Sequence, residues 1–332
     1  WSSDVCSSDL SIKDVAKVAG VSATTVSRVL NNRGYISKET KRKVYAAIED
    51  VEYYPNDIAR ALLSNKTNLI GLIFPMINNP FHVELISYIE TILSEKGFKV
   101  LLCNSMNNPK KEQDYLTMLR RNQVDGIIVG THNDNIPDYN ISGLPVVAID
   151  RYLGENVVTV SCDNYAGGRL AVESLLEKGC KNILCIRGNS KLKLPANKRS
   201  QAYIDIMNEN NLKVNIAEVE FIKSIEEKFE LVKEIILANK DIDGVFAGDD
   251  LLASMVLNIC ENQGIDVPND LKVIGFDGAS QTLVYLPKLT TIKQPIKKIA
   301  EVSVDKLIRK INGEEVDNEI GLPVVLHKGK TI

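Results

Sequence analysis

The sequence predicts two parts of different fold class, a small all-α head at the N-terminus and a larger α/β body with parallel sheets. Three short amphipathic segments fill residues 11–55, and from Leu69 onward short apolar runs alternate with amphipathic helical segments. A length of 332 residues exceeds what one ordinary hydrophobic core supports. We therefore expect a three-helix head and a body of two α/β lobes.

The first ten residues, WSSDVCSSDL, nearly repeat themselves. They lack the basic start and the apolar stretch of a signal peptide. We interpret residues 1–10 as a cloning or sequence-assembly scar, with a native flexible arm as the alternative. The expected fold begins at Ser11.

Each of the three head helices is predicted by a stripe of apolar residues at helical spacing. The stripes are Ile12, Val15, Ala16 and Ala19 in the first, Val26, Val29 and Leu30 in the second, and Val44, Ala47, Ile48 and Val51 in the third. Gly20 suits the end of the first helix, and Ser22 and Ser37 suit the N-caps of the next two. Two short helices joined at a tight turn and supported by a third are typical of a helix-turn-helix.

The charge of the head differs from that of the body. Between Ser11 and Lys66 ten Lys or Arg face six Asp or Glu, a net charge of +4 on a chain whose total is −3. A basic head on an acidic body favours a nucleic-acid reader, although a few surface lysines could also produce it. The alternative is a packing module of three helices with a solvated polar face.

In a helix-turn-helix the second helix enters the major groove with its N-terminal residues at the base edges. Ala23, Thr24 and Arg28 are the candidates for reading bases, because a methyl can touch thymine and a guanidinium can fork onto guanine. A second set can hold DNA phosphates and set the register. These backbone candidates are Ser22, Ser27, Lys38 and Lys41.

Two stretches carry a resemblance to a known family. IKDVAKVAGVSATTVSRVLNN, followed by YYPNDIARALLSNKTNLIGLIFP, resembles the start of a LacI-type transcriptional repressor, and the resemblance extends from residue 11 to residue 332. GLIFPMINNPFHVELISYIE and SCDNYAGGRLA look closest to sucrose-operon repressors of Gram-positive bacteria. The resemblance implies a DNA-binding domain at 11–55, a hinge helix and linker at 56–66, and an effector-binding and dimerisation domain at 67–332.

The resemblance also implies a role for the hinge. In this family the segment folds on operator DNA and pairs with its copy, and its matching residues here are Asn56, Ala59 and Leu62. Leu62 would enter the minor groove as a wedge between base steps. Packing of Leu62 against the body is the alternative.

The body should contain parallel strands that alternate with helices, as in periplasmic-binding-protein-like folds. We expect strands at 69–74, 99–103, 126–130, 145–150, 182–188, 218–222, 244–248 and 272–277. Ligands of such sheets bind beyond the carboxyl ends of the strands, which places the site in the cleft between two lobes.

Residues after the strand ends are therefore the candidates for binding a polyol, by carboxylates and guanidinium groups on hydroxyls and by aromatic faces on C–H surfaces. The candidates are Phe81, His82, Asp150, Arg151, Arg199, Phe221, Asp250 and Gln294. The resemblance places Arg199 and Asp250 at positions that usually hold effector. The alternatives are an N-cap role for Asp249 or Asp250, a core role for Phe221 and a surface ion pair for Arg199.

Several function classes find no support in the sequence. The six cysteines form no Cys-x-x-Cys pair, and the three histidines lie too far apart to suggest a metal site. No catalytic motif and no apolar run of about 20 residues is present. We expect no enzyme, no cofactor, no metal and no membrane association.

The combined expectation is a homodimeric, cytoplasmic, nucleoid-associated repressor of a sugar-utilisation operon. It would bind double-stranded operator DNA and be released by a small sugar or sugar phosphate of the sucrose or fructose type. One alternative is a global catabolite regulator that uses a phosphoprotein co-regulator. Another is a repressor that responds to ribose or a purine. A secreted sugar-binding protein or a two-lobed enzyme fits the head less well.

Overall fold

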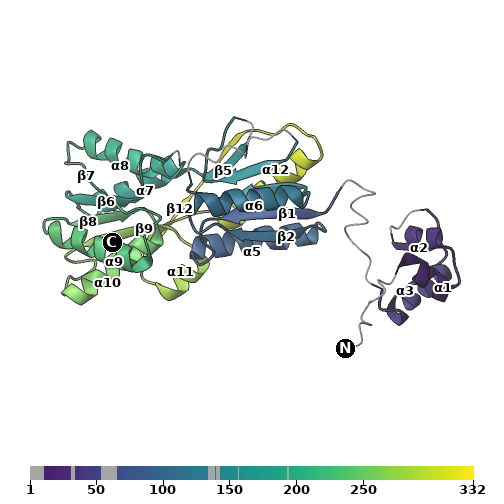
Figure 1. Cartoon of the computed structure of the whole chain (residues 1–332). Helices are drawn as coiled ribbons and strands as arrows, with labels where there is room; N and C mark the ends of the chain where they lie inside the picture. Colours follow the sequence, from purple (N-terminus) through teal and green to yellow (C-terminus); the bar gives the residue numbers. More distant parts are fainter. Residues whose placement is uncertain are drawn as a thin grey trace, which may run out of the picture. The chain divides into compact units, whose positions relative to one another are not determined.

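The computed structural model describes residues 11–30, 34–53, 66–133, 139, 143–155, 157–192 and 194–332. The chain forms two compact units, Trp1–Thr67 and Asn68–Ile332. In the described residues of the first unit lie three helices, α1 (Ile12–Ala19), α2 (Ala23–Leu30) and α3 (Lys38–Asp50), as predicted (Figure 1). No helix in the described part of the chain is long and apolar enough to cross a membrane.

The three head helices share one small core. Its buried residues are Val15, Ala16, Val26, Val29, Val44 and Ala47. Gly20 ends α1 in the left-handed conformation, at φ 66°, which an L-residue with a side chain adopts only with strain. Ser22 and Ser37 accept hydrogen bonds from the backbone N–H groups of Thr25 and Thr40, so both act as N-caps.

The second unit has two six-stranded sheets, one in each lobe. The first lobe has the strand order β11-β5-β4-β3-β1-β2, and the second has β12-β10-β9-β8-β6-β7. All neighbouring strands pair in parallel except β10 and β12, which pair antiparallel. The strands are β1 (Leu69–Phe74), β2 (Lys99–Asn104), β3 (Gly126–Val129), β4 (Val146–Ile149), β5 (Val158–Cys162), β6 (Ile183–Arg187), β7 (Asn215–Glu218), β8 (Gly244–Ala247), β9 (Lys272–Asp277), β10 (Thr290–Lys293), β11 (Glu319–Leu322) and β12 (Val325–His327).

Helices cover both lobes (Figure 1). The helices are α5 (Pro80–Glu95), α6 (Pro109–Arg121), α7 (Asn164–Glu177), α8 (Asn197–Glu209), α9 (Ile225–Ala238), α10 (Asp250–Gln263), α11 (Ser280–Tyr285) and α12 (Ile296–Ile311). α5 and α12 bury Leu85 and Ile299 in the core of the first lobe, whereas α7 and α8 bury Val172 and Tyr203 in the core of the second.

The chain passes between the lobes three times, at residues 163, 294–295 and 323–324. Each passage follows a strand of one lobe and precedes an element of the other. The two lobes are therefore joined only by these connecting segments in the described part of the body. In such an arrangement, ligand binding in the cleft can alter the angle between the lobes.

The sequence prediction of alternating strands and helices is confirmed, but it did not include β5, β10, β11 and β12, and it misplaced one strand. The strand expected at 218–222 lies at Asn215–Glu218, so Phe221 follows the strand instead of ending it. The apolar pattern of EVEF was misread as strand because Val219 is buried in the lobe core although it lies beyond the last strand residue.

Candidate nucleic-acid and ligand sites

The outward face of α2 carries two of the three base-reading candidates. Thr24 and Arg28 are exposed, and their spacing of four residues places them one above the other on the same face. Ala23 and Ser27 are half-buried at the edge of this face. Val26 and Val29 point into the head core, which fixes the rotation of the helix. The core therefore orients Thr24 and Arg28 away from the protein.

Three of the four candidate phosphate contacts lie at the starts of α2 and α3, and Ser27 lies in the middle of α2. Ser22 and Lys38 are exposed, and Lys41 is half-buried on α3. On the same helix Lys43 pairs with Glu39 at 2.9 Å, so its charge is partly neutralised. The hinge candidates Asn56, Ala59 and Leu62 lie outside the described residues.

A cavity between the two lobes, here called the inner cavity, encloses about 970 Å³ of empty space, part of it open to solvent. Its charged, imidazole and aromatic lining residues are Phe74, Phe81, His82, His132, Asp150, Arg187, Arg199, Phe221, Phe246, Asp249 and Asp277. Six of the eight effector candidates line it: Phe81, His82, Asp150, Arg199, Phe221 and Gln294. A cleft with aromatic walls and convergent polar groups is typical of a small-molecule site.

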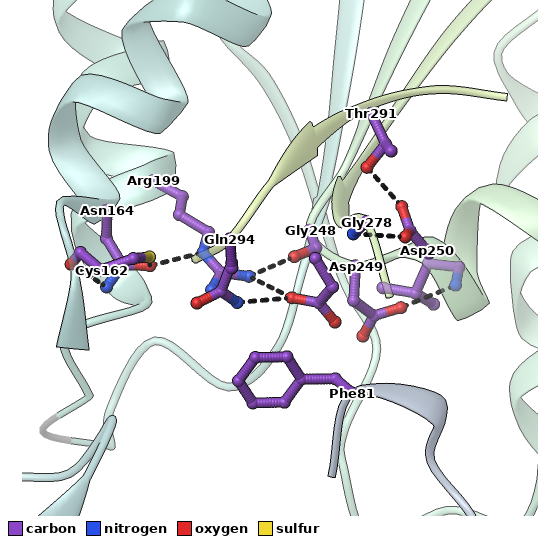
Figure 2. Close-up of polar contacts among 12 residues, drawn as sticks. Phe81, Cys162, Asn164, Arg199, Gly248, Asp249, Asp250, Gly278, Thr291 and Gln294 are labelled. Atoms are coloured by element: carbon purple, nitrogen blue, oxygen red, sulfur yellow. Dashed lines mark hydrogen bonds and ion pairs between the residues drawn. The ribbon is translucent and has the colours of Figure 1, made fainter. Parts of the chain in front are cut away.

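Arg199, in the first turn of α8, lines this cavity, and several polar contacts hold its side chain (Figure 2). Its Nε donates to Asn164 Oδ1 at 2.7 Å, and its Nη1 donates to the Gly248 carbonyl at 2.8 Å. The guanidinium carbon also lies 3.5 Å from the centroid of the Phe276 ring. Gly168 on α7 allows this position, because a Cβ there would clash with the Arg199 carbonyl oxygen. The arginine is therefore fixed before any ligand arrives.

Three carboxylates surround the guanidinium. Asp277 Oδ1 lies 3.6 Å from Arg199 Nη1 and accepts a hydrogen bond from Gln294 Nε2 at 2.8 Å. Burial raises the pKa of Asp150, Asp249 and Asp277, and the nearby Arg199 guanidinium opposes that rise. Asp150 and Asp277 also have left-handed backbones, at φ 51° and 114°. Such strain in non-glycine residues is concentrated at binding sites.

Asp250 does not line the inner cavity, which differs from the sequence prediction. Its carboxylate accepts hydrogen bonds from Gly278 N–H and from the Thr291 hydroxyl, so it points toward the strand ends of the second lobe (Figure 2). Asp249 lines the cavity and caps α10 by accepting from Leu252 N–H at 2.7 Å. Of this pair, Asp249 lines the inner cavity, whereas Asp250 lines a neighbouring hollow that shares Asn79, Phe81 and Asp277 with it.

Arg151 also lies outside the cavity lining. Its side chain is buried, and Nη2 donates to the Asn133 carbonyl at 3.0 Å. The direction of the chain after β4 explains the difference, because Asp150 turns into the cavity and Arg151 turns toward the loop that follows β3.

Two imidazoles, His82 and His132, also line the inner cavity, together with Phe221. His82 Nδ1 donates to the Met76 carbonyl at 2.9 Å. Burial lowers the pKa of His82 to about 4 and that of His132 to about 3, so both rings are neutral at physiological pH. The His132 ring stacks on Phe221 with centroids 4.2 Å apart, which joins the first lobe to the second.

A second hollow, here called the cleft mouth, adjoins the inner cavity and shares Asn79 and Phe221 with it. It is lined by Met76, Ile77, Asn78, Asn79, Pro80, Asn104, Met106, Asn107, Phe221, Ile222, Lys223, Ser224, Ile225, Lys228 and Leu251. Asn107 connects the two spaces, because its amide nitrogen donates to the Phe221 carbonyl and its oxygen contacts His132 Nδ1.

Sequence reasoning did not select several residues of the site, among them His132, Asn164, Asp249 and Asp277. Asp277 could have been predicted from the sequence, because it ends the apolar run KVIGFD in the same way as Asp150 ends the run PVVAID. Among the described residues no group of three or more His, Cys, Asp or Glu side chains could hold a metal ion.

A helix-turn-helix unit joined to a two-lobed body with an inter-lobe ligand cavity defines a ligand-responsive DNA-binding regulator. Residues 11–56 match the family described as bacterial regulatory proteins, lacI family. Residues 67–329 match the periplasmic binding proteins and sugar binding domain of the LacI family. The chain belongs to the LacI family of bacterial transcriptional regulators and is not an enzyme.

Known relatives agree with this assignment. The chain is 44% identical to the sucrose operon repressor of Pediococcus pentosaceus over 96% of this chain and 98% of that protein. It is similar to the lac repressor dimer bound to operator and an anti-inducer, at 25% identity and a TM-score of 0.85 over 97% and 98% of the two chains. A LacI-type regulator from Alkaliphilus metalliredigens in complex with D-xylulofuranose is 33% identical, with a TM-score of 0.72 over 80% and 98%. The predicted resemblance to sucrose-operon repressors is confirmed.

Proposed function

We propose that this regulator is a cytoplasmic, homodimeric repressor of a sugar-utilisation operon, released from its operator by a sugar of the sucrose or fructose type. The observation that carries the proposal is the inner cavity, whose ligand-facing side chains come from both lobes. The high identity to a sucrose operon repressor supports the sugar class.

In this proposal Thr24 and Arg28 read base edges, because they form the exposed face of a helix whose opposite side is fixed in the core. Ala23 permits close approach to the groove. Ser22, Ser27, Lys38 and Lys41 hold the DNA backbone, and two heads of a dimer read two half-sites. Asn56, Ala59 and Leu62 contact the minor groove at the centre of the operator.

The inner cavity favours an uncharged sugar ring. Asp150, Asp249 and Asp277 can accept hydrogen bonds from hydroxyl groups, and Arg199 can donate to them. Phe81 and Phe221 offer apolar surface to the C–H face of a ring. A phosphate in this cavity would face three carboxylates, and Arg187 is already paired with Glu218 at 3.0 Å.

Two of the site residues lie at the passages between lobes, which couples the cavity to lobe movement. Asn164, which accepts from Arg199, begins α7 directly after the first passage. Gln294, which donates to Asp277, lies within the second passage. A sugar that binds the DNA-weak lobe arrangement more tightly lowers operator affinity, and operator lowers sugar affinity by the same factor.

The test is operator binding with and without sugar. The full-length protein would select its operator from random duplexes, and fluorescence anisotropy would then measure operator affinity with sucrose, fructose, ribose or a purine present. We expect sucrose or fructose to weaken operator binding at least tenfold. A response to ribose or a purine alone would replace the sugar assignment and retain the repressor.

A further inference from the structure

Glu112 is a buried carboxylate that does not line the inner cavity. It lies in the first turn of α6, and 0% of its surface is exposed. Within the described part of the chain, no lysine or arginine lies within 4.0 Å of its carboxylate. Burying a carboxylate without a cation destabilises the fold unless hydrogen bonds compensate. The positive end of the helix dipole at the start of α6 also favours a negative charge.

Three hydrogen bonds compensate for the burial of Glu112, and all three come from the segment between β3 and β4. Oε2 accepts from the Thr131 hydroxyl at 2.7 Å and from Asn133 Nδ2 at 2.6 Å. Oε1 accepts from the Tyr139 hydroxyl at 2.7 Å. Burial and the nearby carboxylate raise the pKa of Tyr139, so its hydroxyl stays protonated and can donate. These bonds of Glu112 therefore hold one segment of the chain in place.

Two of these bonds flank His132. The side chains of Thr131 and Asn133 both reach the Glu112 carboxylate, whereas the side chain between them lines the inner cavity. The Asn133 carbonyl also accepts from Arg151 Nη2 at 3.0 Å, so the backbone that follows His132 is held as well. The position of His132 is therefore determined by contacts on both sides of it.

His132 is the residue through which this segment contacts the other lobe. Its ring stacks on Phe221 with centroids 4.2 Å apart and with an angle of 19° between the planes. Its Nδ1 contacts Asn107 Oδ1 at 3.3 Å, and Asn107 Nδ2 donates to the Phe221 carbonyl at 3.4 Å. Stacking of two rings depends on their orientation. A displaced His132 would therefore lose this contact between the lobes.

We propose that Glu112 is a positioning residue for the inner cavity, which holds His132 against Phe221 and thereby determines how tightly the closed lobes retain a ligand. Glu112 acts through His132, because it is buried outside the cavity lining. The effect on a ligand rests on the proposed sugar response, whereas the placement of His132 can be measured without any sugar.

The decisive variants are Glu112→Ala and Asn133→Ala. The first removes all three hydrogen bonds, and the second is a milder change that removes one bond beside His132. Glu112→Gln is the conservative variant, because its amide oxygen can accept the two bonds beside His132 while its nitrogen donates to the Tyr139 oxygen. Tyr139→Phe is the matched control, because it removes a bond of similar length to the same carboxylate that does not flank His132.

Histidine NMR of the full-length protein without ligand measures the placement of His132. Burial lowers the pKa of His132 to about 3, so its ring signal should not titrate above about pH 5 in the wild type. Smaller contributions to this pKa come from the neighbouring His82, Arg151 and Lys228. In the two decisive variants we expect titration near the ordinary value of about 6.5, because a ring released from Phe221 reaches solvent. The conservative variant and the control should behave as the wild type does.

Calorimetry with sucrose and fructose measures the effect on a ligand. Glu112→Ala should weaken binding roughly tenfold in the wild type, but it should cause no further loss when added to His132→Ala. This result is expected because a residue that acts through His132 has no effect once that ring is removed. Urea unfolding measures the structural contribution separately, and Tyr139→Phe should lower stability without changing sugar affinity.

An unchanged His132 signal in the folded decisive variants would overturn the proposal. Equal titration in Tyr139→Phe would overturn it as well, since the effect would then be a general loosening of the lobe. Additive losses of sugar affinity in the double variant would show that Glu112 does not act through His132. If Glu112→Ala does not fold, Asn133→Ala provides the same comparisons. If neither sugar binds the wild type, the proposed sugar response fails, and the histidine titration still decides whether Glu112 places His132.

Discussion

Arg199 and Asp277 form a buried ion pair whose Nη1 and Oδ1 atoms lie 3.6 Å apart, at the point where the second lobe faces the inner cavity. The same guanidinium donates to Asn164 and Gly248, and the same carboxylate oxygen accepts from Gln294. One ion pair thus links α8, the strand ends of the second lobe and two passages between lobes.

Arg199→Lys should weaken sugar binding and preserve operator binding. A lysine keeps the positive charge but cannot reproduce the fork that bonds Asn164 and Gly248 together. We expect a loss of tenfold or more in sugar affinity, about 1.4 kcal/mol, by calorimetry. Arg169→Lys is the control, because Arg169 lies on α7 away from the cavity and pairs with Glu173 and Glu209. Equal effects of both changes would remove Arg199 from the site.

Asp249→Asn and Asp250→Asn should separate binding from stability. Asparagine is as good an N-cap as aspartate, so Asp249→Asn should keep stability and lose sugar affinity. In Asp250→Asn, one of the two acceptor oxygens becomes an amide nitrogen, which is a donor. Either Gly278 N–H or the Thr291 hydroxyl then loses its acceptor. It should lower the free energy of unfolding by roughly 1–3 kcal/mol, because a buried donor loses its acceptor.

Urea unfolding and sugar calorimetry on both variants measure the two effects separately. A normal sugar response in Asp249→Asn, together with its loss in a stable Asp250→Asn, would return the ligand role to Asp250.

The contrast between Asp249 and Asp250 shows why the site could be predicted only in part. The rule that ligands bind beyond strand ends identified this dipeptide and six other side chains that line the cavity. It could not choose between adjacent aspartates, because the choice depends on the rotation of α10, which packing of Leu252 and Val256 determines. His132 was not predictable, since its place opposite Phe221 requires both lobes.

The fold itself was predictable for a different reason. Periodic apolar residues determine which elements form, and the three head helices and most strands follow from that pattern alone. The position of β7 was predicted wrongly because Val219 is buried although it lies beyond the end of the strand. An apolar residue at that position therefore does not indicate a strand.

Arg28→Ala should weaken operator binding by about 1–3 kcal/mol and relax preference at one base position. The exposed guanidinium lies on the face of α2 that the core turns outward, and its removal takes away base contacts without disturbing packing. Anisotropy titrations on the selected operator and on random duplex measure the loss of affinity and the loss of sequence preference. Arg42→Ala, at an exposed position on α3, is the control. An equal loss on operator and random DNA would make Arg28 a phosphate contact.

The two cleft imidazoles should make the protein sensitive to acid. Burial lowers the pKa of His82 to about 4 and that of His132 to about 3, whereas an unfolded histidine titrates near 6.5. Between these values the unfolded chain binds more protons than the folded chain, so stability is present above about pH 6.5 and is lost as the pH falls toward 4. Each imidazole should contribute a loss of about 1.4 kcal/mol per pH unit at most.

His82→Gln and His132→Gln remove these titrations one at a time. Urea unfolding at pH 7.5 and pH 5 gives the loss of stability on acidification for each protein, and we expect it to be roughly 1–2 kcal/mol smaller in each variant than in the wild type. His327→Gln is the control, because His327 lies on β12 and lines neither the inner cavity nor the cleft mouth. If all three variants lost as much stability as the wild type, the acid sensitivity would originate in other groups.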